Sequence, residues 1–264
     1  MVVHCVGLDL PQVFTVFDEY KVSAHYVIPQ LTGAELKLAM PYKFANVTLN
    51  YPDKVPVIQL VSDLDKAWHA GLSNFADFNN VAECKNGINP SSIGIEFHTP
   101  GYGDGGNDWY KFTPFTKGQQ ETGIKLIQHL MDDFHINHHN LLAHSTISVG
   151  RKTDPGPLFF FKELQQANLG YMPTPKASVH SATEDSTVQF IQQKLLAIGF
   201  NKCPQTGALD DPTQDHIDAF IMQFTPHIWQ GKHTPVSQEL IEHLEGFEPC
   251  VIGVNNDCLM KVEL

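Results

Sequence analysis

The sequence predicts an α/β domain, with a mixed central sheet flanked by helices, followed by a small three-helix domain. Over residues 1–170, short apolar runs typical of buried strands alternate with segments of helical periodicity. A stretch rich in proline, serine and threonine follows, and after it only helical patterns occur. We therefore place the first domain at 1–170, a linker at 171–185, and a helical domain with a C-terminal tail at 186–264.

Five strands are predicted in the first domain. Each is a short apolar or β-branched run bounded by polar residues, glycine or proline, and the runs are 2–6, 23–28, 57–61, 93–98 and 141–144. A short helix is predicted over 11–20, and the clearest helical pattern covers 116–134, where apolar residues recur on one face. Within 31–56 the pattern is less clear: a helical turn is predicted over 36–40 and a loop over 41–56.

Three amphipathic patterns predict the helical domain. The first pattern stops at Gly199. The second begins at Asp211-Pro212, an N-cap followed by a first-turn proline. Leu240 and Leu244 mark the third pattern, because they fall on one face of a helix.

Composition limits the classes of function. The formal net charge of -12 argues against a nucleic-acid partner, because phosphate binding needs clustered Lys and Arg. No stretch approaches the ~20 continuous apolar residues of a membrane span, and no secretory signal is visible. The five cysteines form no recognisable zinc or disulfide framework, although Cys250 and Cys258 could pair in an oxidising compartment.

The segment from His144 to Pro157 concentrates groups that can carry chemistry. His144 ends an apolar run, Asp154 precedes Pro-Gly-Pro ten residues later, and Lys152 lies two residues before the aspartate. His4 lies in the first predicted strand. If that strand neighbours the one ending at His144, two imidazoles and one carboxylate could hold a zinc ion with one open position, as in catalytic sites. The alternative is a hydrogen-bonded core histidine and an aspartate that caps a turn.

Glu96 lies inside the apolar run 93–98, where a carboxylate is costly unless it is paired or functional. Beside a zinc site, Glu96 could act as a general acid and base. Lys152 could place positive charge near a developing oxyanion. A glutamate that faces solvent and a surface lysine are the plainer interpretations.

Five segments of the first domain occur in the order found in one family. Together they resemble the zinc-dependent N-acetylmuramoyl-L-alanine amidases of AmpD/AmiD type, which share a fold with peptidoglycan recognition proteins. The match spans residues 1 to about 165. The segments are Val-Val-His4-Cys, Ser-Ala-His25-Tyr-Val-Ile, Trp68-His69-Ala-Gly, Ser-Ile-Gly-Ile-Glu96, and His144 to Pro157.

The resemblance implies a cofactor, a ligand set and a reaction. The cofactor is zinc, held by His4, His144 and Asp154. Glu96 and Lys152 are the implied catalytic pair, as acid/base and as stabiliser of the oxyanion. The implied reaction is hydrolysis of the amide bond between N-acetylmuramic acid and L-alanine in peptidoglycan or muropeptides.

The resemblance also implies contacts to substrate and wall. Trp68 and His69 match a motif near the substrate groove, with a core aromatic as the alternative for Trp68. The helical region resembles a small peptidoglycan-binding domain, so we expect deletion of residues 180–264 to spare cleavage of small muropeptides. This architecture suggests the bacterial cell envelope or periplasm, with the cytoplasm as the alternative because no signal is visible.

Two other functions remain open at this point. A non-catalytic peptidoglycan-recognition module would share the fold, but such proteins typically lack a zinc ligand. A zinc peptidase could instead cut within the stem peptide. All three candidate ligands and Glu96 are present, which favours the amidase. The sequence makes no prediction of the oligomeric state.

Overall fold

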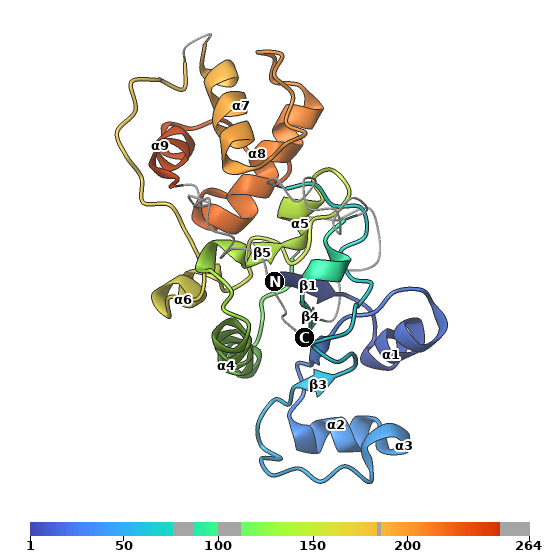
Figure 1. Cartoon of the computed structure of the whole chain (residues 1–264). Helices are drawn as coiled ribbons and strands as arrows, with labels where there is room; N and C mark the ends of the chain where they lie inside the picture. Colours follow the sequence, from blue (N-terminus) through green and yellow to red (C-terminus); the bar gives the residue numbers. More distant parts are fainter. Residues whose placement is uncertain (76–86, 100–111, 184–185, 249–264) are drawn as a thin grey trace.

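The computed structural model describes residues 1–75, 87–99, 112–183 and 186–248, and its centre is a five-stranded sheet of order β3-β2-β4-β1-β5 (Figure 1). β1 pairs in parallel with β4 and β5, and β4 in parallel with β2, whereas β3 is antiparallel to β2. This confirms the predicted mixed sheet. The strands are β1 Val2–Val6, β2 Tyr26–Ile28, β3 Ile58–Gln59, β4 Gly94–His98 and β5 Leu142–Ala143.

One face of the sheet is covered by α4 (Lys117–Asp133) and α6 (Phe161–Gln166). A capping box formed by Thr116 and Gln119 begins α4. Leu130 of α4 belongs to the same buried cluster as Ile95 of β4. Because side chains alternate along a strand, the residue after Ile95 faces away from α4.

The opposite face carries α1 (Leu10–Glu19), α2 (Gly33–Ala39) and α3 (Pro41–Phe44). Leu36 and Met40 pack into a cluster with Val27 of β2 and the apolar face of α1. The helical turn predicted near 36–40 overlaps α2, whereas the loop predicted over 41–56 was wrong over 41–44. A capping box between Thr32 and Glu35 begins α2, but α3 is only four residues long, too short to show periodicity in the sequence.

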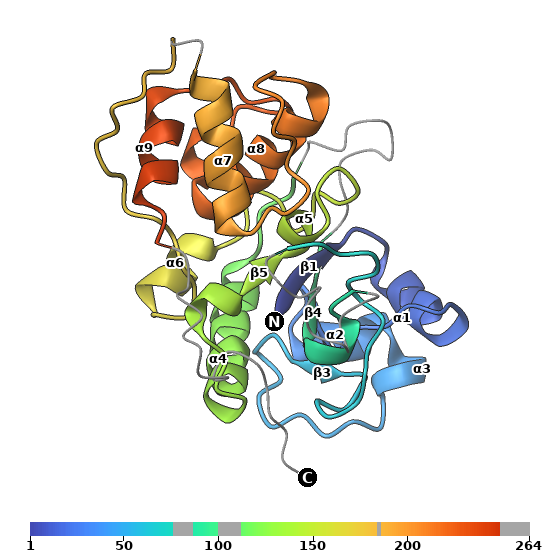
Figure 2. The ribbon, with the colours of Figure 1, turned by 45° about the horizontal axis from the view of Figure 1, so that its top comes forward.

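Three helices follow in the C-terminal region, as predicted: α7 Thr187–Ile198, α8 Asp211–Phe224 and α9 Gln238–Gly246. They lie together beside β5 and α5 (His144–Ile147) in both views (Figures 1 and 2). Their core is shared with the sheet region, since Val2 and Ile147 belong to the same buried cluster as Ile217 and Phe220. The helical region and the β5 edge of the sheet are therefore packed as one body.

Within the described ranges, no helix combines the length and the apolar character needed to cross a bilayer. Cys5 and Cys203 are free thiols. The expected pairing of Cys250 with Cys258 falls outside the described residues, so it stays a prediction.

Candidate metal centre

Three predicted ligands meet in one buried cluster. His4 Nδ1 lies 2.9 Å from His144 Nδ1 and 3.5 Å from Asp154 Oδ2. His144 Nδ1 lies 3.1 Å from the same carboxylate oxygen. All three residues are buried, with exposed fractions of 1%, 4% and 6%. The three donor atoms are close enough together to bind a single ion.

The parallel sheet brings these residues together from distant parts of the chain. Val3 of β1 pairs with Ala143 of β5, so the residues that follow them, His4 and His144, also lie side by side. The backbone N–H of Ser145 donates to the carbonyl of Asp154 at 2.9 Å, which closes the ten-residue loop. The predicted strand 141–144 was one residue too long at each end, because β5 spans Leu142–Ala143 and His144 begins α5.

The contacts behind the cluster favour one tautomer of each ring, although Arg151 Nη2 also lies 3.4 Å from His144 Nε2. His144 Nε2 lies 3.1 Å from the Ala70 carbonyl oxygen, which can only accept, so in the neutral ring the proton is on Nε2. His69 Nε2 likewise faces the Ser92 carbonyl at 3.3 Å, so His69 Nδ1 is an acceptor. His4 Nε2 lies 3.0 Å from that atom and must donate to it.

The Nδ1 atoms of His4 and His144 therefore both present lone pairs, and so does Asp154 Oδ2. With the ring protons on Nε2, three acceptor atoms converge, an arrangement that a cation stabilises; without the cation, a proton on either Nδ1 can bond to Asp154 instead. Two imidazoles and one carboxylate, each imidazole oriented by a hydrogen bond behind it, suit a zinc ion. Burial opposes ionisation of Asp154, yet His144 and His4 hold the pKa of its carboxyl well below the usual range.

Glu96 stands beside the cluster, because the β1–β4 register places it opposite His4. Its Oε2 is buried and has no hydrogen-bond partner among the described residues. Burial, and then the charge of Asp154, raise the pKa of Glu96 to about 8. A buried carboxyl with a raised pKa next to a metal-binding cluster is a candidate for proton transfer.

Two basic residues follow α5 and have different surroundings. Lys152 is exposed, and its charge opposes the rise in the pKa of Glu96. Arg151 Nη2 donates to the carbonyls of Ala70 at 2.6 Å and Leu72 at 2.8 Å. Arg151 thus holds the carbonyl that orients His144. Sequence reasoning missed Arg151, whose only signal was its place next to Lys152.

Trp68 and His69 point to different environments although they are neighbours. Trp68 is 53% exposed, and the Lys66 ammonium lies 3.6 Å from the centre of its ring. His69 is buried behind His4 and packs against Gly94, where an added Cβ would lie 2.3 Å from His69 Cγ. The described structure thus places His69 against a ligand, and contact of either residue with substrate stays a prediction.

Gln223 of α8 connects the helical region to the ligand-bearing segment. Its carboxamide accepts from the Ala143 backbone N–H at 2.9 Å and from the Thr146 hydroxyl at 2.6 Å, and it donates to the Leu141 carbonyl at 3.0 Å. β5 lies at the edge of the described sheet. The Gln223 side chain forms hydrogen bonds to outer backbone groups of β5, which a further strand would otherwise pair. These bonds flank His144, and no sequence pattern pointed to them.

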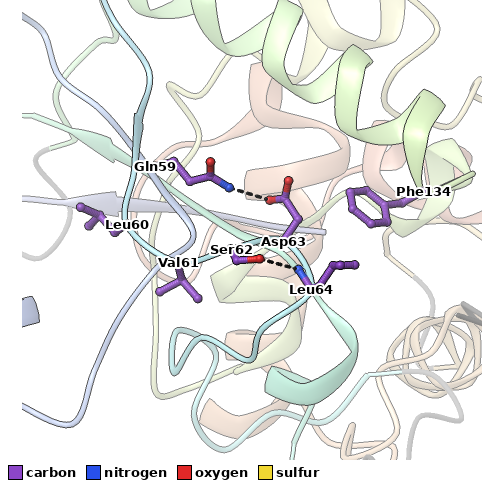
Figure 3. Close-up of a pocket in the computed structure, with 7 residues that line it drawn as sticks. All are labelled: Gln59, Leu60, Val61, Ser62, Asp63, Leu64 and Phe134. Atoms are coloured by element: carbon purple, nitrogen blue, oxygen red, sulfur yellow. Dashed lines mark hydrogen bonds between the residues drawn. The ribbon is translucent and has the colours of Figure 1, made fainter. Parts of the chain in front are cut away.

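A separate pocket of about 590 Å³ lies elsewhere, between the segment 59–64 and Phe134 at the end of α4 (Figure 3). The Asp63 carboxylate in it accepts from Gln59 Nε2 at 3.4 Å and from the Tyr26 hydroxyl at 2.5 Å. Tyr26 packs in the cluster on the α4 face of the sheet. The pocket is therefore distinct from the metal-binding cluster.

Comparisons with known proteins show the family of this chain. Residues 1–157 match the family model described as N-acetylmuramoyl-L-alanine amidase. The chain is 27% identical over 252 residues to the N-acetylmuramoyl-L-alanine amidase AmiD of Escherichia coli, covering 92% of this chain and 81% of that protein. It is 35% identical over 103 residues to the 1,6-anhydro-N-acetylmuramyl-L-alanine amidase AmpD of Enterobacter cloacae, covering 39% of this chain and 46% of that protein.

Solved structures show the same fold along most of the chain. Escherichia coli AmiD in complex with anhydro-N-acetylmuramic acid-L-Ala-D-gamma-Glu-L-Lys has a TM-score of 0.69 and 25% identity, covering 93% of this chain and 86% of that chain. AmpDh3 of Pseudomonas aeruginosa, in complex with an anhydromuramic pentapeptide, has a TM-score of 0.66 and 24% identity, covering 93% of this chain and 89% of that chain. Both likenesses extend beyond the residues of the family model.

Proposed function

This chain belongs to the N-acetylmuramoyl-L-alanine amidase family and is of AmpD/AmiD type, and on that premise we propose that it is a zinc-dependent enzyme. It would hydrolyse the amide bond between N-acetylmuramic acid and L-alanine. The observation that carries this proposal is the convergence of one metal-ligand atom each from His4, His144 and Asp154 beside Glu96, whose buried Oε2 has no hydrogen-bond partner in the described structure. The anhydro-muropeptide bound to Escherichia coli AmiD supports anhydro-muropeptides as substrates.

The ligands in this proposal are His4, His144 and Asp154. When bound, zinc supplies a Lewis acid for the scissile carbonyl and lowers the pKa of water. The protein itself holds the ligands in position before the ion binds. His69 fixes the His4 ring from behind, and Ala70 fixes the His144 ring. The site therefore needs little reorganisation when the ion binds.

Glu96 is the proposed proton carrier of the reaction. It would take a proton from the attacking water and give one to the alanine nitrogen as the carbon–nitrogen bond breaks. The leaving group then departs as a neutral amine. Lys152 would place its positive charge near the oxyanion that forms when water adds to the carbonyl carbon. Trp68, which is exposed, would offer an aromatic face to the substrate.

A peptidoglycan-recognition module without catalysis is the alternative to this proposal. Such a module needs neither a buried general base nor a set of oriented metal ligands. Glu96 is costly where it lies, because its Oε2 is buried without a partner in the described structure. That cost is explained by a catalytic role and has no explanation in simple recognition, so we favour the enzyme.

The helical region has a proposed role of its own. We propose that residues 186–264 form a wall-binding domain after a linker at 171–185, as the resemblance suggests. Attachment to the wall would raise the local concentration of substrate at the metal centre. The cell envelope is the location that this role requires.

The ligand assignment predicts the zinc content of a variant. His144→Ala removes one of three donors, so the purified protein should lose the zinc of this centre, about one ion per chain, and release no stem peptide from muropeptides. Inductively coupled plasma mass spectrometry gives the zinc content. His129→Ala, which changes an exposed histidine of α4, is the control and should keep both zinc and activity. Unchanged zinc content in His144→Ala would contradict the assignment.

His69 is predicted to act through His4 rather than on the substrate. His69→Phe keeps an aromatic ring but removes the acceptor for His4 Nε2, so zinc affinity should fall about 10- to 100-fold, the usual effect of losing an outer hydrogen bond to a metal ligand. Competition with a chelator measures this affinity. A raised KM with unchanged zinc affinity would instead place His69 in the substrate groove.

A further inference from the structure

A second group of metal-binding side chains lies in the helical region, apart from the first. His227 comes from the 3-10 helix η5 (Pro226–Ile228), and Glu239 and His243 come from α9. One donor atom from each residue lies within 4.8 Å of the others. Neither the predicted wall-binding role nor the metal centre at His144 uses any of these side chains.

The two α9 residues are already arranged like ligands of one ion. Glu239 and His243 are four residues apart, so their side chains lie on the same side of the helix. His243 Nδ1 donates to the Glu239 backbone carbonyl at 2.7 Å, which places the ring proton on Nδ1. The lone pair of the neutral ring is then on Nε2. Hydrogen bonding of the second ring nitrogen to a carbonyl is the usual arrangement for a metal-binding histidine.

The third residue completes the set from a different element. His227 Nε2 lies 2.7 Å from Glu239 Oε1, and the centres of the His227 and His243 rings are 5.3 Å apart. His243 is 6% exposed, whereas the side chains of His227 and Glu239 are each 52% exposed. The group therefore has a fixed inner ligand and two outer ligands that solvent and ions can reach.

An ordinary ion pair elsewhere provides a comparison. His129 and Asp133 on α4 are also four apart, with His129 Nε2 3.4 Å from Asp133 Oδ2. That pair belongs to no group of three donors in the part of the chain that the structure describes. The group on α9 differs by its third donor and by the oriented ring of His243.

We propose that His227, Glu239 and His243 form a second divalent-metal site, which binds zinc and joins η5 to α9. Two imidazoles and one carboxylate suit zinc, and water can complete the coordination at the exposed side. Because the ligands come from two elements that are separated along the chain, the bound ion would stabilise the folded helical region. This site is independent of the proposed catalytic function.

The test separates the two sites by working in the His144→Ala background, with the full chain. Zinc is titrated into metal-free protein by isothermal calorimetry, and cobalt is titrated in parallel for its visible spectrum. We expect one site per chain in His144→Ala. Adding His227→Ala or Glu239→Gln should weaken zinc binding at least 10-fold. Adding His129→Ala, the matched control, should leave it unchanged.

Thermal melts provide a second readout of the same site. Zinc should raise the Tm of His144→Ala, and it should raise the Tm much less once His227→Ala is added. The His227 side chain is half exposed, so this variant keeps the apolar core intact and should fold. The proposal is overturned if His144→Ala binds no zinc, or if His227→Ala and Glu239→Gln bind it as tightly as the His129→Ala control.

Discussion

Replacing Glu96 with glutamine is expected to lower turnover by about 10²-fold or more while zinc stays bound. Glutamine has nearly the same shape but cannot accept and return a proton at this position. Glu96 is not among the three donor atoms of the metal-binding cluster, so the ligand set stays complete. Release of stem peptide from anhydro-muropeptides gives the rate, and the zinc content of the same sample confirms that the site is filled.

A matched control distinguishes this effect from a general loss of negative charge. Glu121→Gln changes an exposed glutamate on α4, and it should leave both rate and zinc content unchanged. If Glu96→Gln turned over at nearly the wild-type rate, Glu96 would have no role in proton transfer. If it lost zinc, Glu96 would instead support the ligands.

The raised pKa of Glu96 also affects the stability of the metal-free protein. In the folded chain the pKa of Glu96 is about 8, well above the usual glutamate value of 4.5, so the folded state binds the proton more tightly than the unfolded state. The contribution of protonated Glu96 to the free energy of unfolding is therefore fully present below about pH 4.5 and is lost as the pH rises toward 8. Metal-free Glu96→Gln should melt higher than metal-free wild type at pH 8, and the difference should shrink at pH 5.

Loss of the Gln223 carboxamide is predicted to have the largest effect on stability. Gln223→Leu leaves the Ala143 N–H, the Leu141 carbonyl and the Thr146 hydroxyl without these partners. A buried polar group without a partner costs about 1–3 kcal/mol, so the combined loss is several kcal/mol. Because these groups flank His144, zinc affinity at the metal centre should fall as well.

Gln192 on α7 provides the control for Gln223. Gln192 is also fully buried, but its hydrogen bonds go to Thr206, Gly207, Ala208 and Thr213, all within the helical region. Gln192→Leu should lower the Tm. The zinc affinity of the metal centre, measured on folded protein, should stay unchanged. Equal zinc affinity in both variants would mean that Gln223 contributes to stability alone.

The shared core also changes the expectation for a truncated chain. The sequence suggested that residues 180–264 could be deleted without affecting cleavage of small muropeptides. In the structure, α8 packs in one cluster with Val2 and Ile147, and Gln223 pairs with β5. We therefore expect the truncated chain to expose part of the core and to lose both stability and activity, on small and large substrates alike.

Local patterns in the sequence predicted the strands and long helices, because burial on one face leaves a period of two or 3.6 residues. The order of the sheet and the approach of His4 to His144 required a guess about which strands are neighbours, and the resemblance to a family supplied it. Hydrogen bonds such as those of Gln223 and Arg151 leave no pattern in the sequence, because a single polar residue can pair with many different groups in the fold. The hydrogen bond between His69 and His4 was not predicted for the same reason.

The mass of the products from a purified anhydro-muropeptide tests the central claim most directly. The zinc-loaded protein should release the intact stem peptide with a free amine on L-alanine, and an equal amount of sugar carrying a free lactyl carboxylate. A chelator should stop the reaction, and added zinc should restore it. Cleavage at a bond within the stem peptide, or no cleavage by protein shown to contain zinc, would contradict the assignment as an amidase.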